Sequence, residues 1–297
     1  MKGILPLWKP RGMTSHDCVM KIRKLLHIKK VGHTGTLDPE VEGVLPICIG
    51  QATKIVPFLT DTKKTYTAEI KLGTATETED SHGKVTEMKN VAIPPSQQKI
   101  ENVLQLFRGN ITQIPPMYSA VKVDGKKLYE YARENEQVER PERYVTIFDL
   151  ELVEGSIRHH SFEVRAVCSK GTYIRTLCVD IGAKLGYPAH MGELYRTGSG
   201  GIRKEDTVTF QQVEQAAEND TLGRILLPIA HGLGHMERLY VDTAAKKRIL
   251  HGQKLSKPAD TPDANPFLMM LGEEVLAIYQ THPEDSGIMK PVRVFND

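Results

Sequence analysis

The sequence predicts an α+β domain followed by a small, β-rich C-terminal domain. Apolar and polar residues alternate at 65–72 and again at 162–168, as in strands with one buried face. Apolar residues at helical spacing recur between these strands, which indicates interspersed helices. After Gly234 the pattern changes to short apolar segments separated by Gly, Pro and Asp turns. We therefore expect a first domain over residues 1–236 and a second over residues 237–297.

The N-terminal part is expected to hold a helix, a loop and a buried strand. Thr14 or Ser15 is a suitable N-cap, and Asp17 would lie in the first turn. The apolar residues that follow have helical spacing: Val19, Ile22, Leu25 and Leu26. Residues 32–39 contain two glycines and a proline, which predicts a loop, and 44–49 is apolar enough for a short buried strand.

The middle of the chain continues the alternation of strands and helices. Polar residues at 73–90 predict a loop or hairpin, and Ser96 is expected to cap a helix that ends at Gly109. An insertion over about residues 123–144 is highly charged and is expected to be partly exposed. The turn at 169–172 leads from the second alternating strand into another helix.

Composition and cysteine usage favour a soluble cytoplasmic protein. Hydrophobic residues make up 40% of the 297, and no apolar run approaches the roughly 18 residues that span a bilayer. Pro6 and Lys9 interrupt the stretch in which a signal peptide would be apolar. The four cysteines form no C-x-x-C pair, which argues against a zinc knuckle and favours a reducing compartment.

Net charge is only +2, but the basic residues are unevenly distributed. Residues 1–64 contain eleven Lys and Arg against five acids, and 243–257 contains five basic residues and no acid. Two basic regions of this kind are suited to following a phosphate backbone. The alternative is that they are ordinary solvated surfaces, and charge alone does not decide between the two.

Motifs for several common kinds of chemistry are absent from the sequence. No G-x-x-x-x-G-K-[ST] loop, strand-linked G-x-G-x-x-G motif or G-x-S-x-G elbow occurs. His231 and His235 stand four residues apart, but the intervening glycines disfavour a helix and no third ligand is evident. We therefore expect neither a nucleotide cofactor nor a metal.

The remaining candidate for chemistry is the loop at 32–39, which carries His33 and Asp38. Pro39 biases the backbone of Asp38 towards an extended conformation. Taken alone, an Asp-Pro turn whose aspartate bonds its own backbone is the simpler interpretation. The hypothesis that Asp38 is a catalytic carboxylate depends on comparing the whole eight-residue string at 32–39 with known families.

That string, Gly-His-Thr-Gly-Thr-Leu-Asp-Pro, resembles the signature of the bacterial TruB family of tRNA pseudouridine synthases. Further segments resemble family motifs in the same order and at similar spacing: 9–15, 64–66, 115–122, 169–177 and 194–197. One departure is Tyr195, where the family often has Arg. The tail after about residue 235 is similar in length and character to the family's PUA RNA-binding domain, with weaker motifs.

The resemblance implies an activity and a fold. The family converts uridine 55 in the T loop of tRNA to pseudouridine, on a pseudouridine synthase fold with a mixed, mainly antiparallel sheet. The reaction breaks the N1–C1′ bond and rejoins the ring through C5, an isomerisation that needs no cofactor. The partner implied is tRNA, at its T arm and elbow. We expect no membrane, no obligate protein partner and a monomeric chain.

The resemblance also implies catalytic roles for three residues. Asp38 would be the catalytic carboxylate, and Arg175 would pair with it and favour its charged form. Whether Asp38 attacks C1′ or removes a C2′ proton is left open. Tyr66 would stack on the flipped uracil and accept the proton from C5; the alternative is a strand residue packed in the core.

Five further residues are expected to bind the RNA. His33 would fill the gap left by the flipped base, because the target must leave its stack before its sugar can be reached. Leu194 would close the pocket from the other side, unless it is only a core leucine. Lys9 and Lys170 would contact the backbone or the pocket, with exposed lysines as the alternative. Asp80 would contact tRNA bases.

Two other functions stay open. The chain could be a non-catalytic RNA-binding or RNA-folding module on the same scaffold, and a tRNA-folding role could coexist with catalysis. It could also be a guide-RNA-dependent synthase of the dyskerin type, although such chains carry terminal extensions, whereas the motifs here begin within the first ten residues. The charged insertion at about 123–144 could be a mobile flap that clamps RNA, and the alternative is a loop with no role in RNA binding.

Overall fold

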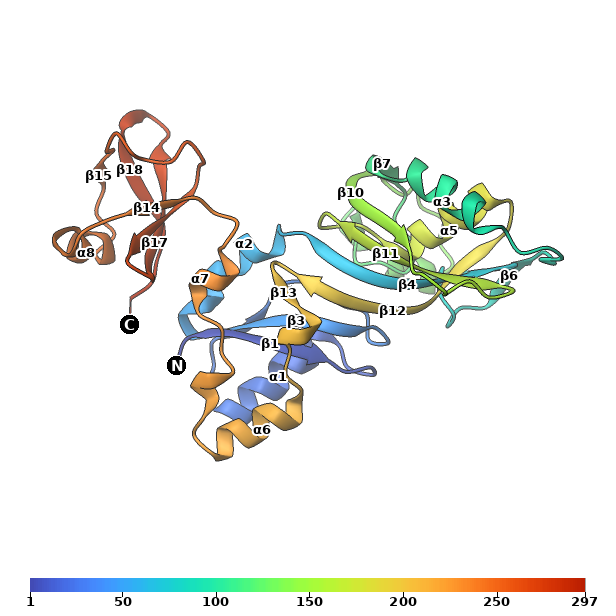
Figure 1. Ribbon diagram of the computed structural model, residues 1–297, viewed down its shortest axis with the longest axis horizontal. Coiled ribbons are helices and arrows are strands. Elements are labelled where there is room, and N and C mark those ends of the chain that lie inside the picture. Colours follow the sequence, from blue (N-terminus) through green and yellow to red (C-terminus); the bar gives the residue numbers. More distant parts are fainter. Residues whose placement is uncertain (297) are drawn as a thin grey trace. The chain divides into compact units, whose positions relative to one another are not determined.

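The computed structural model describes residues 1–296, which form two compact units (Figure 1). Unit 1 contains residues 1–40, 44–60 and those from 200 onwards, and unit 2 contains residues 41–43 and 61–199. Unit 1 therefore joins the beginning of the chain to its end, and the middle of the chain forms unit 2. The domain boundary expected between residues 236 and 237 stays a prediction.

The first part of unit 1 contains three strands, which two helices cover. Its strands are β1 (Gly3–Lys9), β2 (Val31–His33) and β3 (Glu42–Ile49), and β2 pairs antiparallel with β3. The helices α1 (Ser15–Leu26) and α6 (Phe210–Glu218) share one apolar core with these strands. Members of this core include Leu5, Cys18, Ile22, Leu45, Ile47 and Val213.

The start of α1 agrees with the predicted cap. The Thr14 side chain accepts from the Asp17 amide at 3.0 Å, and the Asp17 carboxylate accepts from the Thr14 amide at 2.9 Å. Short elements complete this part of unit 1: η1 (Gly50–Ile55), α2 (Val56–Thr60), β13 (Ile202–Arg203), η2 (Lys204–Asp206), η3 (Leu222–Arg224) and α7 (Ile229–Gly232).

The C-terminal part of unit 1 is a five-stranded sheet with one helix, which confirms the predicted β-rich tail. The strands lie in the order β14 (Arg238–Tyr240), β16 (Phe267–Leu271), β17 (Glu274–His282), β18 (Asp285–Val294) and β15 (Leu255–Ser256). Helix α8 (Thr243–Leu250), which the sequence pattern did not reveal, packs on the sheet through Ile249. The remaining apolar residues of the sheet, such as Leu268 and Ile278, pack against Ile4 and Ile55 of the N-terminal part.

Unit 2 is built on an antiparallel sheet. The strands lie in the order β12 (Ala189–Ser199), β4 (Lys64–Leu72), β11 (Ser161–Cys168), β10 (Arg143–Leu152) and β7 (Gly109–Gln113). Helices α3 (Gln97–Leu106) and α5 (Ile174–Leu185) pack against it.

The first residues of β3 add a parallel pairing at the edge of this sheet. Glu42 and Gly43 pair with Tyr195 and Arg196 of β12. Only glycine fits at position 43, because a Cβ there would lie 2.3 Å from the carbonyl oxygen of Arg196. The sheet is thus mixed and mainly antiparallel, and the predicted fold class is confirmed.

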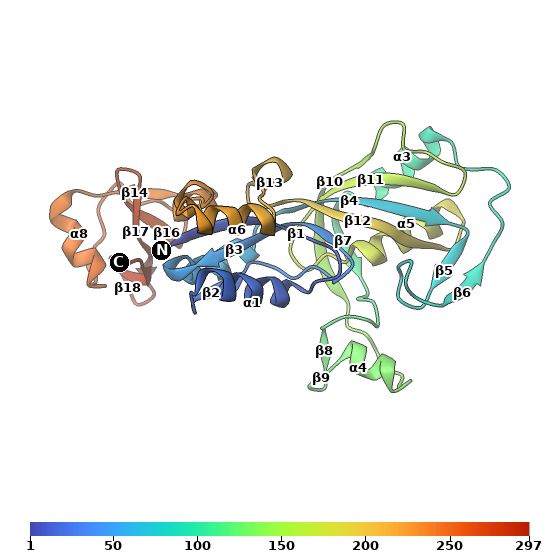
Figure 2. The same cartoon turned by 90° about the horizontal axis from the view of Figure 1, so that it is seen from below.

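Two excursions leave the sheet of unit 2. The first is a hairpin of β5 (Thr74–Thr76) and β6 (Val85–Met88), within the stretch predicted to be a loop or hairpin. The second is the flap segment, residues 114–142, between β7 and β10 (Figure 2). It carries β8 (Lys122–Val123), β9 (Lys126–Lys127) and α4 (Leu128–Arg133), which project from the rest of the unit.

Candidate active-site residues in the two units

The loop that carries Asp38 is fixed on both sides of this residue. Before it, the Ser15 hydroxyl accepts from the amide of Leu37 at 2.8 Å and donates to the Leu37 carbonyl at 3.3 Å. After it, the Pro39 carbonyl accepts from the Gly12 amide at 2.9 Å. Leu37 is buried whereas Asp38 is exposed, so the backbone is held while the carboxylate is presented.

Lys9 lies beneath the same loop. Its side chain is fully buried, and its amine donates to the carbonyls of Pro10 at 2.8 Å and Pro39 at 3.0 Å. A buried ammonium is tolerated only with such partners. The observed role of Lys9 is therefore to support the loop backbone, and a contact between Lys9 and RNA stays a prediction.

His33 is the last residue of β2, five positions before Asp38. Its Nδ1 accepts from the Gly35 amide at 3.3 Å, which orients the half-buried ring. Because an accepting Nδ1 carries no proton, the neutral ring has its proton on Nε2. In unit 1, His33 and Asp38 therefore belong to one loop, and Lys9 bonds to the backbone of that loop.

In unit 2, Tyr66 and Leu194 share a face of the sheet. Tyr66 lies on β4, opposite Arg196 of β12, and Leu194 lies on β12, opposite Ala68 of β4. Residues two apart on a strand point to the same side, so these side chains are neighbours on one face. Tyr66 is half-buried, and Leu194 is 8% exposed.

Arg175 lies in the first turn of α5 and is buried. Its Nη1 donates to the Thr78 carbonyl at 3.0 Å, and its Nη2 donates to the Tyr118 carbonyl at 2.9 Å. Thr78 belongs to the turn of the β5–β6 hairpin, and Tyr118 belongs to the flap segment. Asp38 belongs to unit 1, and its pairing with Arg175 stays a prediction.

Two buried cations beside Tyr66 were not singled out from the sequence. Lys64 is 5% exposed and Arg196 is 1% exposed, and the Lys64 amine donates to the Thr62 carbonyl at 2.6 Å. Burial, followed by the charge of Arg196, lowers the pKa of Lys64 to about 8. Both residues stand inside segments that resemble family motifs, which is the signal that could have found them.

Lys170 and Asp80 have local partners in unit 2. Lys170 is exposed and forms a surface ion pair with Asp61. Asp80 accepts from the Thr78 hydroxyl at 2.6 Å and from the His82 amide at 2.9 Å, so it shapes the turn of the β5–β6 hairpin. The predicted contacts of both residues with RNA stay predictions.

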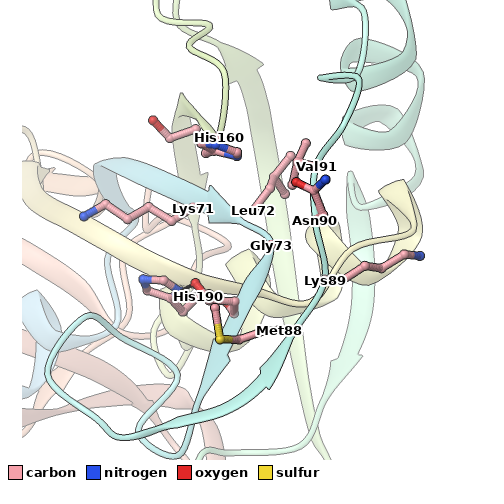
Figure 3. A pocket seen from close by; sticks show the side chains of 11 residues that line it. Lys71, Leu72, Gly73, Met88, Lys89, Asn90, Val91, His160 and His190 are labelled. Carbon is pink, nitrogen blue, oxygen red and sulfur yellow. Dashed lines mark hydrogen bonds between the residues drawn. The ribbon is translucent and has the colours of Figure 1, made fainter.

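A hollow of about 560 Å³ lies at the far end of β4 (Figure 3). Its walls include Leu72, Val91, His160 and His190, and no residue of the predicted site lines it. Within residues 1–296, no three His, Cys, Asp or Glu side chains are grouped to hold a metal ion. None of the helices in that range has the length and apolar character that crossing a bilayer requires.

Comparisons with known proteins cover nearly the whole chain. Residues 23–174 match the N-terminal domain of the TruB family pseudouridylate synthases, and residues 175–233 match the tRNA pseudouridylate synthase B C-terminal domain. The tRNA pseudouridine synthase B of Oceanobacillus iheyensis is 60% identical, covering 99% of this chain and 98% of that protein. The protein of the same name from Bacillus subtilis is 49% identical, covering 99% and 97%.

Solved structures show the same fold. A chain from an H/ACA RNP bound to a substrate RNA containing 2′-deoxyuridine aligns with a TM-score of 0.76 at 25% identity, covering 99% of this chain and 85% of that one. A chain from a Cbf5–Nop10–Gar1 complex aligns with a TM-score of 0.75 at 29% identity, covering 99% and 84%.

Proposed function

Because the chain belongs to the TruB family of pseudouridylate synthases, we propose that it converts uridine to pseudouridine in the T loop of tRNA, at position 55. The observation that carries this proposal is the 60% identity, over nearly the full length, to a tRNA pseudouridine synthase B. The fixed loop that presents Asp38 supports it, because a reacting carboxylate must be held in place.

The reaction rearranges one nucleotide and needs no second substrate. The bond between N1 and C1′ breaks, the uracil turns, and C5 forms the new bond to C1′. The hydrogen of C5 leaves as a proton, and N1 gains one, so atoms and electrons balance. We assign Asp38 to the step at the sugar, either as a nucleophile at C1′ or as a base at C2′.

The other residues would prepare this step and complete it. His33 would occupy the gap left by the flipped nucleotide, and its oriented ring suits that task. Tyr66 would stack on the uracil and receive the C5 proton, with Leu194 beside it on the same sheet face. Arg175 would keep Asp38 ionised, since a guanidinium favours the charged form of a carboxylate.

Binding of the T arm would involve charges at the surface. Lys170 is exposed, and its surface ion pair with Asp61 is weak enough to be exchanged for a contact with a phosphate. Asp80 would face tRNA bases near the turn of the β5–β6 hairpin. We propose that the chain acts as a monomer without an obligate protein partner. A bare T-arm hairpin, with no guide RNA and no added protein, should therefore be modified.

The test uses T-arm RNA labelled with tritium at C5 of uridine. Release of tritium reports exchange at C5, and mass mapping of the product locates the pseudouridine. The wild-type chain should release tritium from one uridine, and Asp38→Asn should release none while binding the RNA with similar affinity. Tritium release by Asp38→Asn would remove the catalytic assignment. RNA binding without release by the wild-type chain would favour a pure RNA-folding module.

A further inference from the structure

The turn of the β5–β6 hairpin, the start of α5 and the ends of the flap segment meet at Glu79. One oxygen of the Glu79 carboxylate accepts from the Thr176 hydroxyl at 2.7 Å. The other oxygen lies 3.9 Å from a guanidinium nitrogen of Arg140, near the end of the flap segment. That same nitrogen donates to the Pro115 carbonyl at 3.0 Å, near the beginning of the flap segment. Arg140 therefore joins both ends of the flap segment to Glu79.

Arg175 is held by the residues on either side of this junction. Its guanidinium donates to Thr78, the residue before Glu79, and to Tyr118 in the flap segment. It also directly precedes Thr176, the partner of Glu79. A planar guanidinium has a fixed fork of donors, so the positions of these two carbonyls set the direction in which it points.

The backbone of Glu79 is itself unusual. Its φ is +63°, in the left-handed region that non-glycine residues rarely adopt. The Glu79 carbonyl accepts from the Met191 amide at 2.9 Å, and this bond to β12 helps to hold the conformation. Strain of this kind is retained where the surrounding structure imposes it, often at functional sites.

The charge on Glu79 depends on the same neighbours. Burial raises the pKa of Glu79, and Asp180 raises it further, whereas the Thr176 hydroxyl and the charges of Arg175 and Arg140 lower it. Movement of Arg140 away from the carboxylate would therefore weaken the ionised form. The position of the flap segment would therefore affect whether the Glu79 carboxylate is ionised.

We propose that Glu79 and Arg140 are positioning residues, which couple the flap segment to Arg175 so that ordering of the flap segment on RNA sets the guanidinium for catalysis. The inference rests on the proposed function, because Arg175 acts here through the isomerisation. The contacts of Glu79 and Arg140 would carry the effect of RNA binding at the flap segment to Arg175.

The test compares Glu79→Gln and Arg140→Gln with Glu87→Gln, an exposed carboxylate on the same hairpin. The first two variants should lower the single-turnover rate about tenfold, while the Kd for T-arm RNA stays within about twofold. Glu87→Gln should match the wild-type chain in both. The double variant should be no slower than the slower single variant, since the two residues act through one contact.

A pH profile separates this role from a merely structural one. In the wild-type chain, protonation of Glu79 should lower the single-turnover rate as pH falls, and Glu79→Gln should lack that step. Wild-type rates in both variants at every pH would overturn the coupling, as would equal losses in rate and RNA affinity. No pseudouridine from the wild-type chain would instead overturn the proposed function, and the inference with it.

Discussion

The Asp38 loop and the flap segment are both irregular connections, yet the structure holds them in opposite ways. The loop is short, and hydrogen bonds fix its backbone on each side: buried Ser15 bonds to Leu37, and buried Lys9 and the Gly12 amide bond to Pro39. The flap segment spans residues 114–142, and ion pairs between its own residues hold its middle part. Lys126 pairs with Glu134 and Glu136, and its amine also lies over the ring of Tyr131.

This difference matches two different tasks. A reacting carboxylate loses rate when it is displaced by even about 1 Å, so its loop must be rigid. A segment that closes on RNA must exchange its internal ion pairs for phosphates, and exposed ion pairs are weak enough to allow this. The comparison predicts that variants of the loop affect chemistry, whereas variants in the projecting part of the flap segment, residues 122–133, affect binding.

The largest effect is expected from Asp38→Glu. The extra methylene displaces the carboxylate, and the fixed loop cannot retreat to compensate, so the single-turnover rate should fall at least about 100-fold. Tritium release from C5-labelled T-arm RNA measures it. Glu40→Asp, an exposed acid two residues away, serves as the control and should keep the wild-type rate. Near-wild-type activity of Asp38→Glu would mean that the loop adapts.

Ser15→Ala should have a smaller effect that includes stability. It leaves the amide and carbonyl of Leu37 buried without the serine hydroxyl, which should cost about 1–3 kcal/mol in the free energy of unfolding. The loosened loop should also slow the reaction about tenfold. Denaturant titration and single-turnover kinetics measure the two effects, with His16→Ala, an exposed neighbour, as the control. Unchanged values for both would show that this hydroxyl does not fix the loop.

Lys122→Gln, in the flap segment, should change binding alone. We expect Lys122, which is exposed, to contact one phosphate, so its loss should weaken RNA affinity a few-fold and reduce the slope of log Kd against log salt by about one unit. The single-turnover rate at saturating RNA should stay at the wild-type value. Asp124→Asn, an exposed acid on the same turn, should not weaken binding. A slower rate with unchanged affinity in Lys122→Gln would mean that this part of the flap segment serves chemistry and not RNA binding.

The smallest signal is expected from hydrogen exchange of the free chain and of the tRNA complex. The Leu37 amide, bonded to Ser15, should exchange slowly in both states. Amides of the flap segment should exchange quickly in the free chain and slowly with tRNA. Equal protection of the flap segment in the two states would remove the flap hypothesis.

Local features of the chain were predictable where the signal lies within a few residues. The alternation in β4 and β11 marked two central strands, and Ser96 and Thr14 marked helix starts through their hydroxyl caps. Helix α8 was missed because its eight residues carry little apolar periodicity, although Asp242 caps it. The helix expected to reach Gly109 ends at Leu106, and Gly109 begins β7 instead.

By itself, the sequence determined the strand and helix periods, the loop of Asp38 and, through resemblance, the family. The tertiary structure alone decided that Lys9 lies buried under that loop, that Arg196 lies beside Tyr66, and that Glu79 links the flap segment to α5. The physical reason is the separation along the sequence over which each kind of interaction acts. Caps and periodicity act over three or four residues, whereas these contacts join residues 30 positions apart or more, whose meeting depends on how the whole chain packs.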